Sequence, residues 1–317
     1  MNSYKTKMNK DKIIKAGKIA AEVKKYAKSI IKKGMPLIEI ADKIEDKIRE
    51  LGGKPAFPVS LSINDIAAHN TPLHDDKVLA SGLLKIDLGA HIDGWSSDTA
   101  FSIDLENSEE NKKVIEASEK ALENAIEMTK EGVNTSEIGR KISETIESYN
   151  LSPIVNLSGH EIKQYDLHAG VTIPNFDNKK DSILKKGVYA IEPFATTGGG
   201  KVHDGKPSGS YVLVNSKNVR SQIARDILKF IEEEYDTLPF CSRWIVKKFG
   251  VKAIFGLNQL EENGNIHHFA QLVESYNSKV SHAEDTILID DDGVIVTTKS
   301  KSPCVLPHLK RCGLFGL

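Results

Sequence analysis

Two segments of the chain carry the same helical pattern, and this internal repeat limits the fold more than any other feature of the sequence. The segment KGMPLIEIADKIEDKIREL begins at Lys33, and EGVNTSEIGRKISETIESY begins at Glu131, 98 residues later. Gly34 aligns with Gly132, and in both copies a longer amphipathic stretch precedes the glycine, a residue common where helices end. The repeat therefore predicts a fold of two similar halves.

A strand pattern follows the helices in each copy. SGLLKIDLGAHIDG, from Ser81, corresponds to KGVYAIEPFAT, from Lys186, so that Asp87 aligns with Glu192. Each half therefore reads as two helices followed by strands, an α/β (α+β) pattern with one carboxylate at the same point of a buried strand.

The repeat is interrupted between about Gly198 and Ser281 by a mainly helical sequence, after which HAEDTILIDDDGVIVTT returns to a strand pattern. We therefore expect a main domain of residues 1–200 and 276–298, a helical insertion of about residues 201–275, and a C-terminal tail of residues 299–317. The tail mixes basic and apolar residues, which fits either a disordered extension or a segment packed on the body.

Composition excludes several classes of protein. The net charge of −1 argues against a general nucleic-acid binder, although residues 1–35 contain eleven lysines. Those lysines overlie a helical apolar pattern and predict a solvated helix face, with a docking face for an anionic partner as the alternative. No signal peptide and no apolar run of about 18 residues is evident, so we expect a cytoplasmic protein without a membrane span. Three cysteines without a Cys-x-x-Cys motif predict neither disulfides nor a thiolate zinc site.

Two aspartates lie close together in the predicted hairpin KIDLGAHIDGWSSDTAFSID. If its turn lies near Ile92-Asp93-Gly94, Asp98 faces either Asp87 or, with the turn centred on Asp93-Gly94, Gly89. In both registers Asp87 and Asp98 share one face, with about 5–8 Å between their Cβ atoms. Such carboxylates repel unless the face is solvated, one of them is protonated, or cations lie between them. A solvent-facing polar side is the alternative.

Further metal-ligand residue types occur in apolar strand sequences. Glu192 stands in YAIEPF, and HAEDTILI contains an adjacent pair, Glu284 and Asp285, between which the repeat does not choose. His160 lies on the strand that precedes Glu192. Carboxylates with one imidazole suit Mn, Fe, Co or Zn, and four carboxylates favour two ions about 3.5 Å apart over one.

The remaining histidines are harder to interpret. His168 follows His160 by eight residues, and His69 ends the equivalent segment of the first half. Each is expected either to donate a hydrogen bond in the same cavity or to be a core residue. The others are expected only at the surface or in turns: His74, His91, His203, His267, His268, His282 and His308.

Four motifs together resemble a known family: SGHEIKQYDLHAGVTIPN, LLKIDLGAHIDGWSSDTA, YAIEPFAT and HAEDTILI. Over about residues 8–298 the chain is similar to type II methionine aminopeptidases in their short archaeal form. The resemblance implies the pita-bread fold, with two pseudo-symmetric halves around a central site and the type II helical insertion. It also implies removal of the N-terminal methionine from nascent proteins and peptides, mainly before a small second residue, by metal-activated water.

The resemblance implies roles for individual residues. His69 and His168 would contact the substrate and stabilise the oxyanion or the scissile amide, and Phe57 would form a wall of the methionine pocket. Glu192 would also transfer the proton. Two divalent ions (Co, Mn, Fe, Zn or Ni) would be held by Asp87, Asp98, His160, Glu192 and Glu284. Of these residues, Asp98 and Glu284 would bridge both ions. This selects Glu284 over Asp285, which occupies a position where the family commonly has His and is expected to face the other side of its strand.

Two other functions compete with this one. The same fold and ligand set occur in prolidases and X-prolyl aminopeptidases, which usually carry a further N-terminal domain. Non-catalytic pita-bread proteins bind RNA, ribosomes or histones and have lost ligands that are retained here. We expect a monomer whose substrate is the methionine end of nascent chains, a function compatible with a position near the ribosome, and we expect no specific nucleic-acid partner.

Overall fold

The computed structural model describes residues 8–299, so Cys304, His308, Cys312 and the predicted tail beyond Lys299 lie outside it. The first half contains two helices and seven short strands: α1 (Lys10–Ile30), α2 (Leu37–Glu50), β1 (Lys54–Pro55), β2 (Ser60–Ile63), β3 (Ile66–Ala68), β4 (Leu83–Leu88), β5 (Ala90–Ile92), β6 (Trp95–Ser96) and β7 (Thr99–Asp104). The second half contains α3 (Glu109–Met128), α4 (Thr135–Ser148), β8 (Ser152–Pro153), β9 (Ser158–Lys163), β10 (Asp166–Pro174), β11 (Gly187–Ile191), β12 (Phe194–Thr196), β16 (Val280–His282), β17 (Asp285–Asp290) and β18 (Gly293–Val296).

The predicted repeat is present as repeated backbone structure. Gly34 and Gly132 have φ angles of 84° and 85°, values that favour glycine. The Gly34 N–H donates to the Ala80 carbonyl at 2.8 Å, and the Gly132 N–H donates to the Leu184 carbonyl at 2.9 Å. In each half the same bond therefore ties the start of the second helix to the chain that leads into the central strand.

The two halves contribute equivalent antiparallel sheets. The first is ordered β2-β4-β7, and the second is ordered β10-β9-β11-β17-β18, in which β9, β11 and β17 repeat the arrangement of the first. The sheets meet where Ala100 of β7 pairs with Glu284, the residue before β17. This junction brings the strands of both halves that carry the predicted metal ligands close together.

Each half also has its own hydrophobic core, made by a pair of helices and a sheet. Apolar side chains of α1 and α2, such as Val23 and Ile44, pack on Leu61 and Ile86 of the first sheet. In the same way α3 and α4 pack on β11 and β17. Both helices of a pair are amphipathic, and burial of the apolar stripe is what holds a helix on its sheet.

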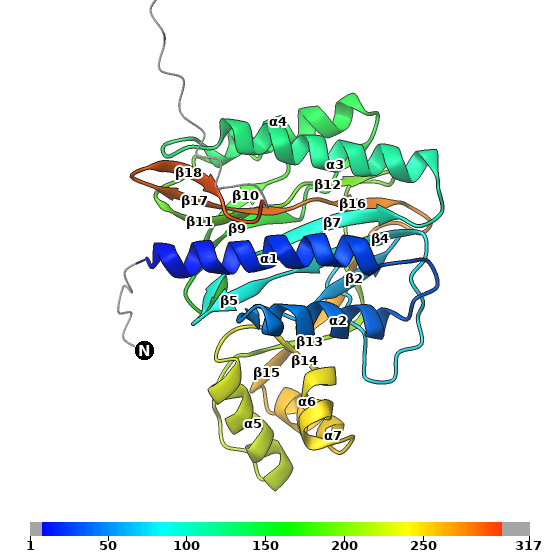
Figure 1. Ribbon diagram of the computed structural model, residues 1–317, viewed down its shortest axis with the longest axis vertical. Coiled ribbons are helices and arrows are strands. Elements are labelled where there is room, and N and C mark those ends of the chain that lie inside the picture. Colours follow the sequence, from blue (N-terminus) through cyan, green and yellow to red (C-terminus); the bar gives the residue numbers. More distant parts are fainter. Residues whose placement is uncertain (1–7, 300–317) are drawn as a thin grey trace, which may run out of the picture.

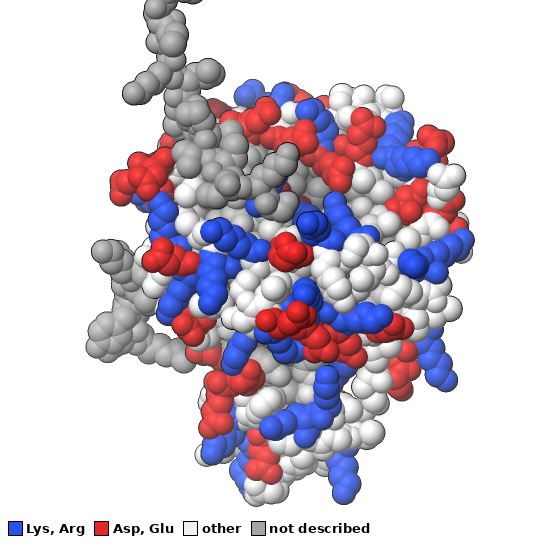
Figure 2. Space-filling model, viewed as in Figure 1, with Lys and Arg blue, Asp and Glu red and all other residues white. Residues whose placement is uncertain are grey.

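The lysine-rich N-terminal sequence forms α1, as predicted. Two of its lysines pair with carboxylates at 2.6–2.7 Å, Lys10 with Asp290 and Lys12 with Asp93. Over the face drawn in Figure 2, basic and acidic side chains are interspersed. None of the helices within residues 8–299 combines the length and apolar character needed to span a membrane.

The segment expected as a helical insertion contains α5 (Gln222–Glu234), α6 (Ser242–Phe249) and α7 (Ala253–Glu262), together with β13 (His203–Leu213), β14 (Phe240–Cys241) and β15 (Ile266–Val273). The helices share a hydrophobic cluster of their own, which includes Ile227, Trp244 and Leu257. The long pair β13 and β15 was not expected from the sequence. β15 pairs with β3, so that this sheet reaches from the helical cluster to the first half (Figure 1).

Candidate metal centre

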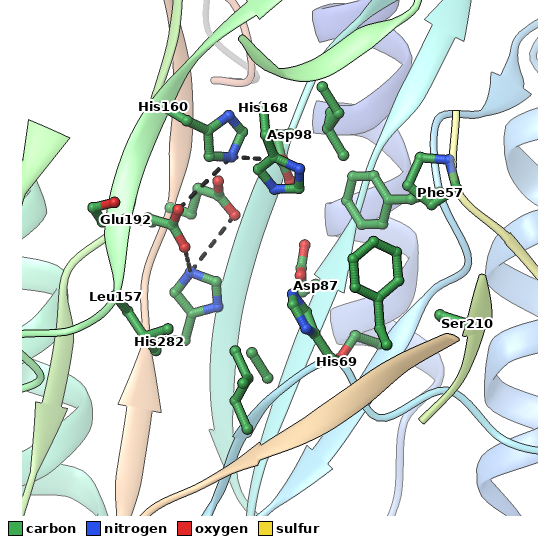
Figure 3. Close-up of a pocket in the computed structure, with 18 of the residues that line it drawn as sticks. Phe57, His69, Asp87, Asp98, Leu157, His160, His168, Glu192, Ser210 and His282 are labelled. Atoms are coloured by element: carbon green, nitrogen blue, oxygen red, sulfur yellow. Dashed lines mark ion pairs between the residues drawn. The ribbon is translucent and has the colours of Figure 1, made fainter. Parts of the chain in front are cut away.

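A cavity of about 240 Å³ lies where the two halves and the insertion meet. All eight residues predicted for the site line it: Phe57, His69, Asp87, Asp98, His160, His168, Glu192 and Glu284. In Figure 3 the side chains of His160, Glu192 and His282 lie on one side, and those of Phe57 and Ser210 lie on the opposite side. The cavity therefore has a polar, titratable end and a more apolar end.

The first-half hairpin positions the two aspartates. Asp93 and Gly94 have φ angles of 49° and 79°. Positive φ at both residues is typical of the two-residue hairpin turn whose twist matches that of the flanking strands. Asp87 pairs with Ala100, so the register places Asp98 across from Gly89 rather than from Asp87. Of the two registers considered, the one with the turn centred on Asp93-Gly94 is present.

Two groups of potential ligands share one residue. Asp98, His160 and Glu284 form one group, and Asp87, His282 and Glu284 form the other; in each, one ligand atom per residue lies within 4.8 Å of the others. The Glu192 carboxylate lies between the two histidines. Its Oε1 is 3.7 Å from His160 Nε2, and its Oε2 is 3.6 Å from His282 Nε2.

Burial controls the protonation of this cluster. Desolvation, with repulsion between neighbouring carboxylates, raises the pKa of Asp87, Glu192 and Glu284 well above their usual values. Desolvation also raises the pKa of Asp98, to about 7. The same loss of solvent lowers the pKa of His160 to about 3, so its imidazole is neutral at physiological pH.

The donor set fits divalent cations. Three buried atoms of this cluster have no hydrogen-bond partner among the described residues: Asp87 Oδ1, Asp98 Oδ1 and His282 Nε2. His160 Nε2 lies 3.6 Å from Asp98 Oδ2 and 3.7 Å from Glu192 Oε1. Buried polar atoms without partners are costly, and a cation would compensate the crowded carboxylates. Carboxylate oxygens and neutral imidazole nitrogens are ligands for Mn, Fe, Co, Ni and Zn.

His69 and His168 approach the cavity from different halves. His69 follows β3 with a φ of 64°, and its ring lies 5.5 Å from that of Phe269. Burial lowers the pKa of His69 to about 4. His168 lies on β10, and its ring is 4.4 Å from that of His160. Both histidines can offer hydrogen bonds beside the carboxylates.

The apolar end draws on all parts of the chain. Phe57, from the first half, packs on Leu167 of the second. Phe269 and Ser210, from the predicted insertion, complete this end. The sequence gives no local sign of these last two, because they reach the cavity only through the pairing of β13, β15 and β3.

Asp285 lies on the other side of its strand, as predicted. Its Oδ1 accepts a hydrogen bond from Thr298 Oγ1 at 2.9 Å and lies 3.4 Å from Lys24 Nζ. It does not line the cavity, whereas Glu284 does. The structure thus separates two neighbouring carboxylates that the repeat left equivalent.

His282 was expected only at the surface or in a turn, and that expectation was wrong. It is 2% exposed and lines the cavity. Side chains two apart in a strand share a face, so the spacing between His282 and Glu284 was a signal for this position.

Comparison with known proteins agrees with this arrangement. Residues 11–291 match metallopeptidase family M24. The chain belongs to this family. Over 297 residues the M24 chain is 45% identical to a methionine aminopeptidase of Pyrococcus abyssi (strain GE5 / Orsay), an alignment that covers 92% of this chain and 100% of that protein. Membership in a metallopeptidase family, together with these carboxylates and imidazoles, supports the use of divalent metal.

Solved structures confirm the predicted pita-bread fold of this M24 chain. A methionine aminopeptidase from Thermotoga maritima superposes with a TM-score of 0.66 at 24% identity, covering 94% of this chain and 100% of that one. A thermophilic Arx1 superposes with a TM-score of 0.79 at 16% identity, covering 92% and 91%. At these identities the likeness is one of fold.

Proposed function

We infer that this M24 chain is a methionine aminopeptidase, which hydrolyses the first peptide bond of polypeptides that begin with methionine. The observation that carries this function is the 45% identity to a methionine aminopeptidase along the full length of that protein. Neither a prolidase-like activity nor a non-catalytic binding role has comparable support. The proposed substrates are nascent proteins and peptides, mainly those with a small second residue.

We propose a centre of two divalent ions, drawn from Co, Mn, Fe, Zn or Ni. Asp87, Asp98, His160, Glu192 and Glu284 would hold them. The support is geometric: Asp98, His160 and Glu284 form one candidate ligand group, and Asp87 joins Glu284 in a second. Glu192 belongs to neither group, but its Oε1 lies 3.7 Å from His160 Nε2. When bound, such ions polarise the substrate carbonyl and lower the pKa of a water molecule toward 7.

Glu192 is the proposed proton carrier. It would accept the proton of the attacking water and deliver it to the leaving amine. Its burial and its position between His160 and His282 support this role, because loss of solvent raises the pKa of the Glu192 carboxyl and so favours acceptance of a proton.

His69 and His168 are the proposed hydrogen-bond donors to the substrate. A neutral imidazole can donate one N–H to a carbonyl oxygen that gains negative charge, and donors of this kind contribute about 10²–10³ in rate. Phe57 and Leu167 would surround the methionine side chain. The cavity of about 240 Å³ suits a single residue, since pockets for drug-sized ligands begin at about 300 Å³.

The decisive experiment is a peptide assay on the full chain, stripped of metal and then loaded with one cation at a time. Met-Ala-Ser should lose its methionine, and peptides with a large second residue should react slowly. Ala-Pro-Ser tests the prolidase alternative. Cleavage of Ala-Pro-Ser but not Met-Ala-Ser would refute the proposal, and failure to bind any divalent ion would favour the non-catalytic alternative.

A further inference from the structure

We propose that His282 is an additional metal ligand, so that each cation of the centre has an imidazole of its own. This inference rests on the proposed two-ion centre and extends it. The five-residue set implied by family resemblance contains one histidine, His160. The structure places a second imidazole at the opposite side of the same carboxylate cluster (Figure 3).

The position of His282 Nε2 is that of a ligand atom. It is buried and has no hydrogen-bond partner among the described residues. It lies 3.6 Å from Glu192 Oε2 and 3.6 Å from Glu284 Oε2. These separations are long for N–H···O hydrogen bonds, which fall mostly between about 2.7 and 3.2 Å. Two atoms that each lie about 2.0–2.2 Å from one cation can be this far apart.

The imidazole is held in this orientation by its surroundings. Its ring stacks on Phe194, with centroids 3.9 Å apart and planes at 14°. Phe194 and His282 are also backbone partners in the pairing of β12 with β16. The backbone N–H of His282 donates to Ser102 Oγ, which donates to the backbone carbonyl of His282, both at 3.0 Å, and these bonds fix the backbone that carries the ring. A side chain fixed in this way loses little conformational entropy when it binds an ion.

The two ligand groups then have the same composition. His160 joins Asp98 and the shared Glu284, and His282 joins Asp87 and the shared Glu284. A second nitrogen ligand makes the Asp87 side of the centre more selective for borderline ions, such as Co, Ni and Zn, over Mn. His282 thus sets which metal this side prefers.

The test is metal binding by the full chain, measured by calorimetry and by the visible spectrum of Co²⁺ after removal of metal. Wild type should bind two Co²⁺ ions. His282→Gln should keep one site at wild-type affinity and weaken the other at least about tenfold, with a smaller loss for Mn²⁺ than for Co²⁺. His203→Gln, which changes an exposed histidine outside the cavity, is the matched control and should behave as wild type.

A gain of signal provides a second test. In His282→Cys, a thiolate in the centre should give a Co²⁺–sulfur charge-transfer band that wild type lacks. Two unaltered Co²⁺ affinities in His282→Gln, or a folded His282→Cys that binds Co²⁺ without this band, would overturn the proposal. If wild type binds two ions and cleaves Met-Ala-Ser in those experiments, the proposed function stands and only the role of His282 is refuted.

Discussion

Ala100 and Glu284 exchange backbone hydrogen bonds: the Ala100 N–H donates to the Glu284 carbonyl at 3.3 Å, and the Glu284 N–H donates to the Ala100 carbonyl at 3.1 Å. Ala100 lies two residues after Asp98, so this pairing sets the position of the Asp98 carboxylate relative to that of Glu284. Lys24 of α1 also donates to the Glu284 carbonyl, at 3.3 Å. The separation of Asp98 and Glu284, the two residues that the family resemblance implies as bridging ligands, is therefore set by the backbone and not by flexible side chains.

Replacing Glu192 by Gln tests the proton carrier. Gln retains the size and an oxygen atom but cannot accept and release the proton, so kcat should fall by about 10²–10⁴ while the protein stays folded. Turnover of Met-Ala-Ser by metal-loaded protein gives the effect, with bound metal measured in parallel. Glu116→Gln, an exposed change, is the control. Substantial activity in Glu192→Gln would refute the assigned role.

Replacing Phe57 by Ala tests the methionine pocket. Removing the ring widens the apolar end, so the ratio of kcat/KM for methionine over phenylalanine at the first position should fall about tenfold or more. Because the measurement is a ratio on one protein, lost stability does not affect it. Phe230→Ala removes a ring from the insertion instead and should leave selectivity unchanged. An unaltered ratio in Phe57→Ala would mean that the first residue binds elsewhere.

The sequence predicted the repeat well because its signals are local. The helices α2 and α4 begin and end at aligned residues, and Gly34 and Gly132 share one backbone conformation. The residues at the apolar end of the cavity were harder to predict from local sequence patterns. Ser210 and Phe269 arrive through pairing between distant strands, and no nearby pattern marks them. His282 differs, because its spacing from Glu284 carried a signal that was not used.

A buried ion pair joins the insertion to α2, and its removal should be costly. Arg243 donates to both oxygens of Glu45, at 2.7 and 3.0 Å, and Trp244 Nε1 donates to Glu45 Oε2 at 2.6 Å. Arg243→Met leaves a buried carboxylate unpaired and should lower the free energy of unfolding by about 3–5 kcal/mol. Adding Glu45→Gln should restore much of this loss, because a neutral amide still accepts from Trp244. Urea denaturation measures both.

The control for that pair lies on the surface. Lys112 pairs with Glu109 at 2.7 Å across one helical turn in solvent, and Lys112→Met should change stability by less than about 1 kcal/mol. If Arg243→Met lowered the free energy of unfolding no more than Lys112→Met does, the pair of Arg243 with Glu45 would not be what stabilises the contact between the insertion and α2.

His91 should make stability depend on pH. It is buried, its Nδ1 accepts a hydrogen bond from the Gly94 N–H at 3.0 Å, and burial lowers its pKa from 6.5 to about 4. The unfolded chain therefore binds more protons between those values, so the stabilisation is complete above pH 6.5 and is lost as pH falls toward 4. At pH 5 the loss is on the order of 2 kcal/mol.

His91→Asn isolates this effect, since Asn can retain the acceptor but does not titrate. The difference in urea midpoint between pH 7.5 and pH 5 should shrink in this variant. The exposed His203→Asn should keep the wild-type difference. Equal differences in all three proteins would show that His91 contributes nothing to acid sensitivity.

Because two separately packed halves line the cavity, the proposed metal site depends on both of them. Asp87 and Asp98 come from one half, and His160, Glu192 and Glu284 come from the other. A fragment containing one half could keep its own core and still lack the donors contributed by the other. The proposed reaction therefore requires both halves in one folded protein, and neither half holds the complete set of proposed ligands.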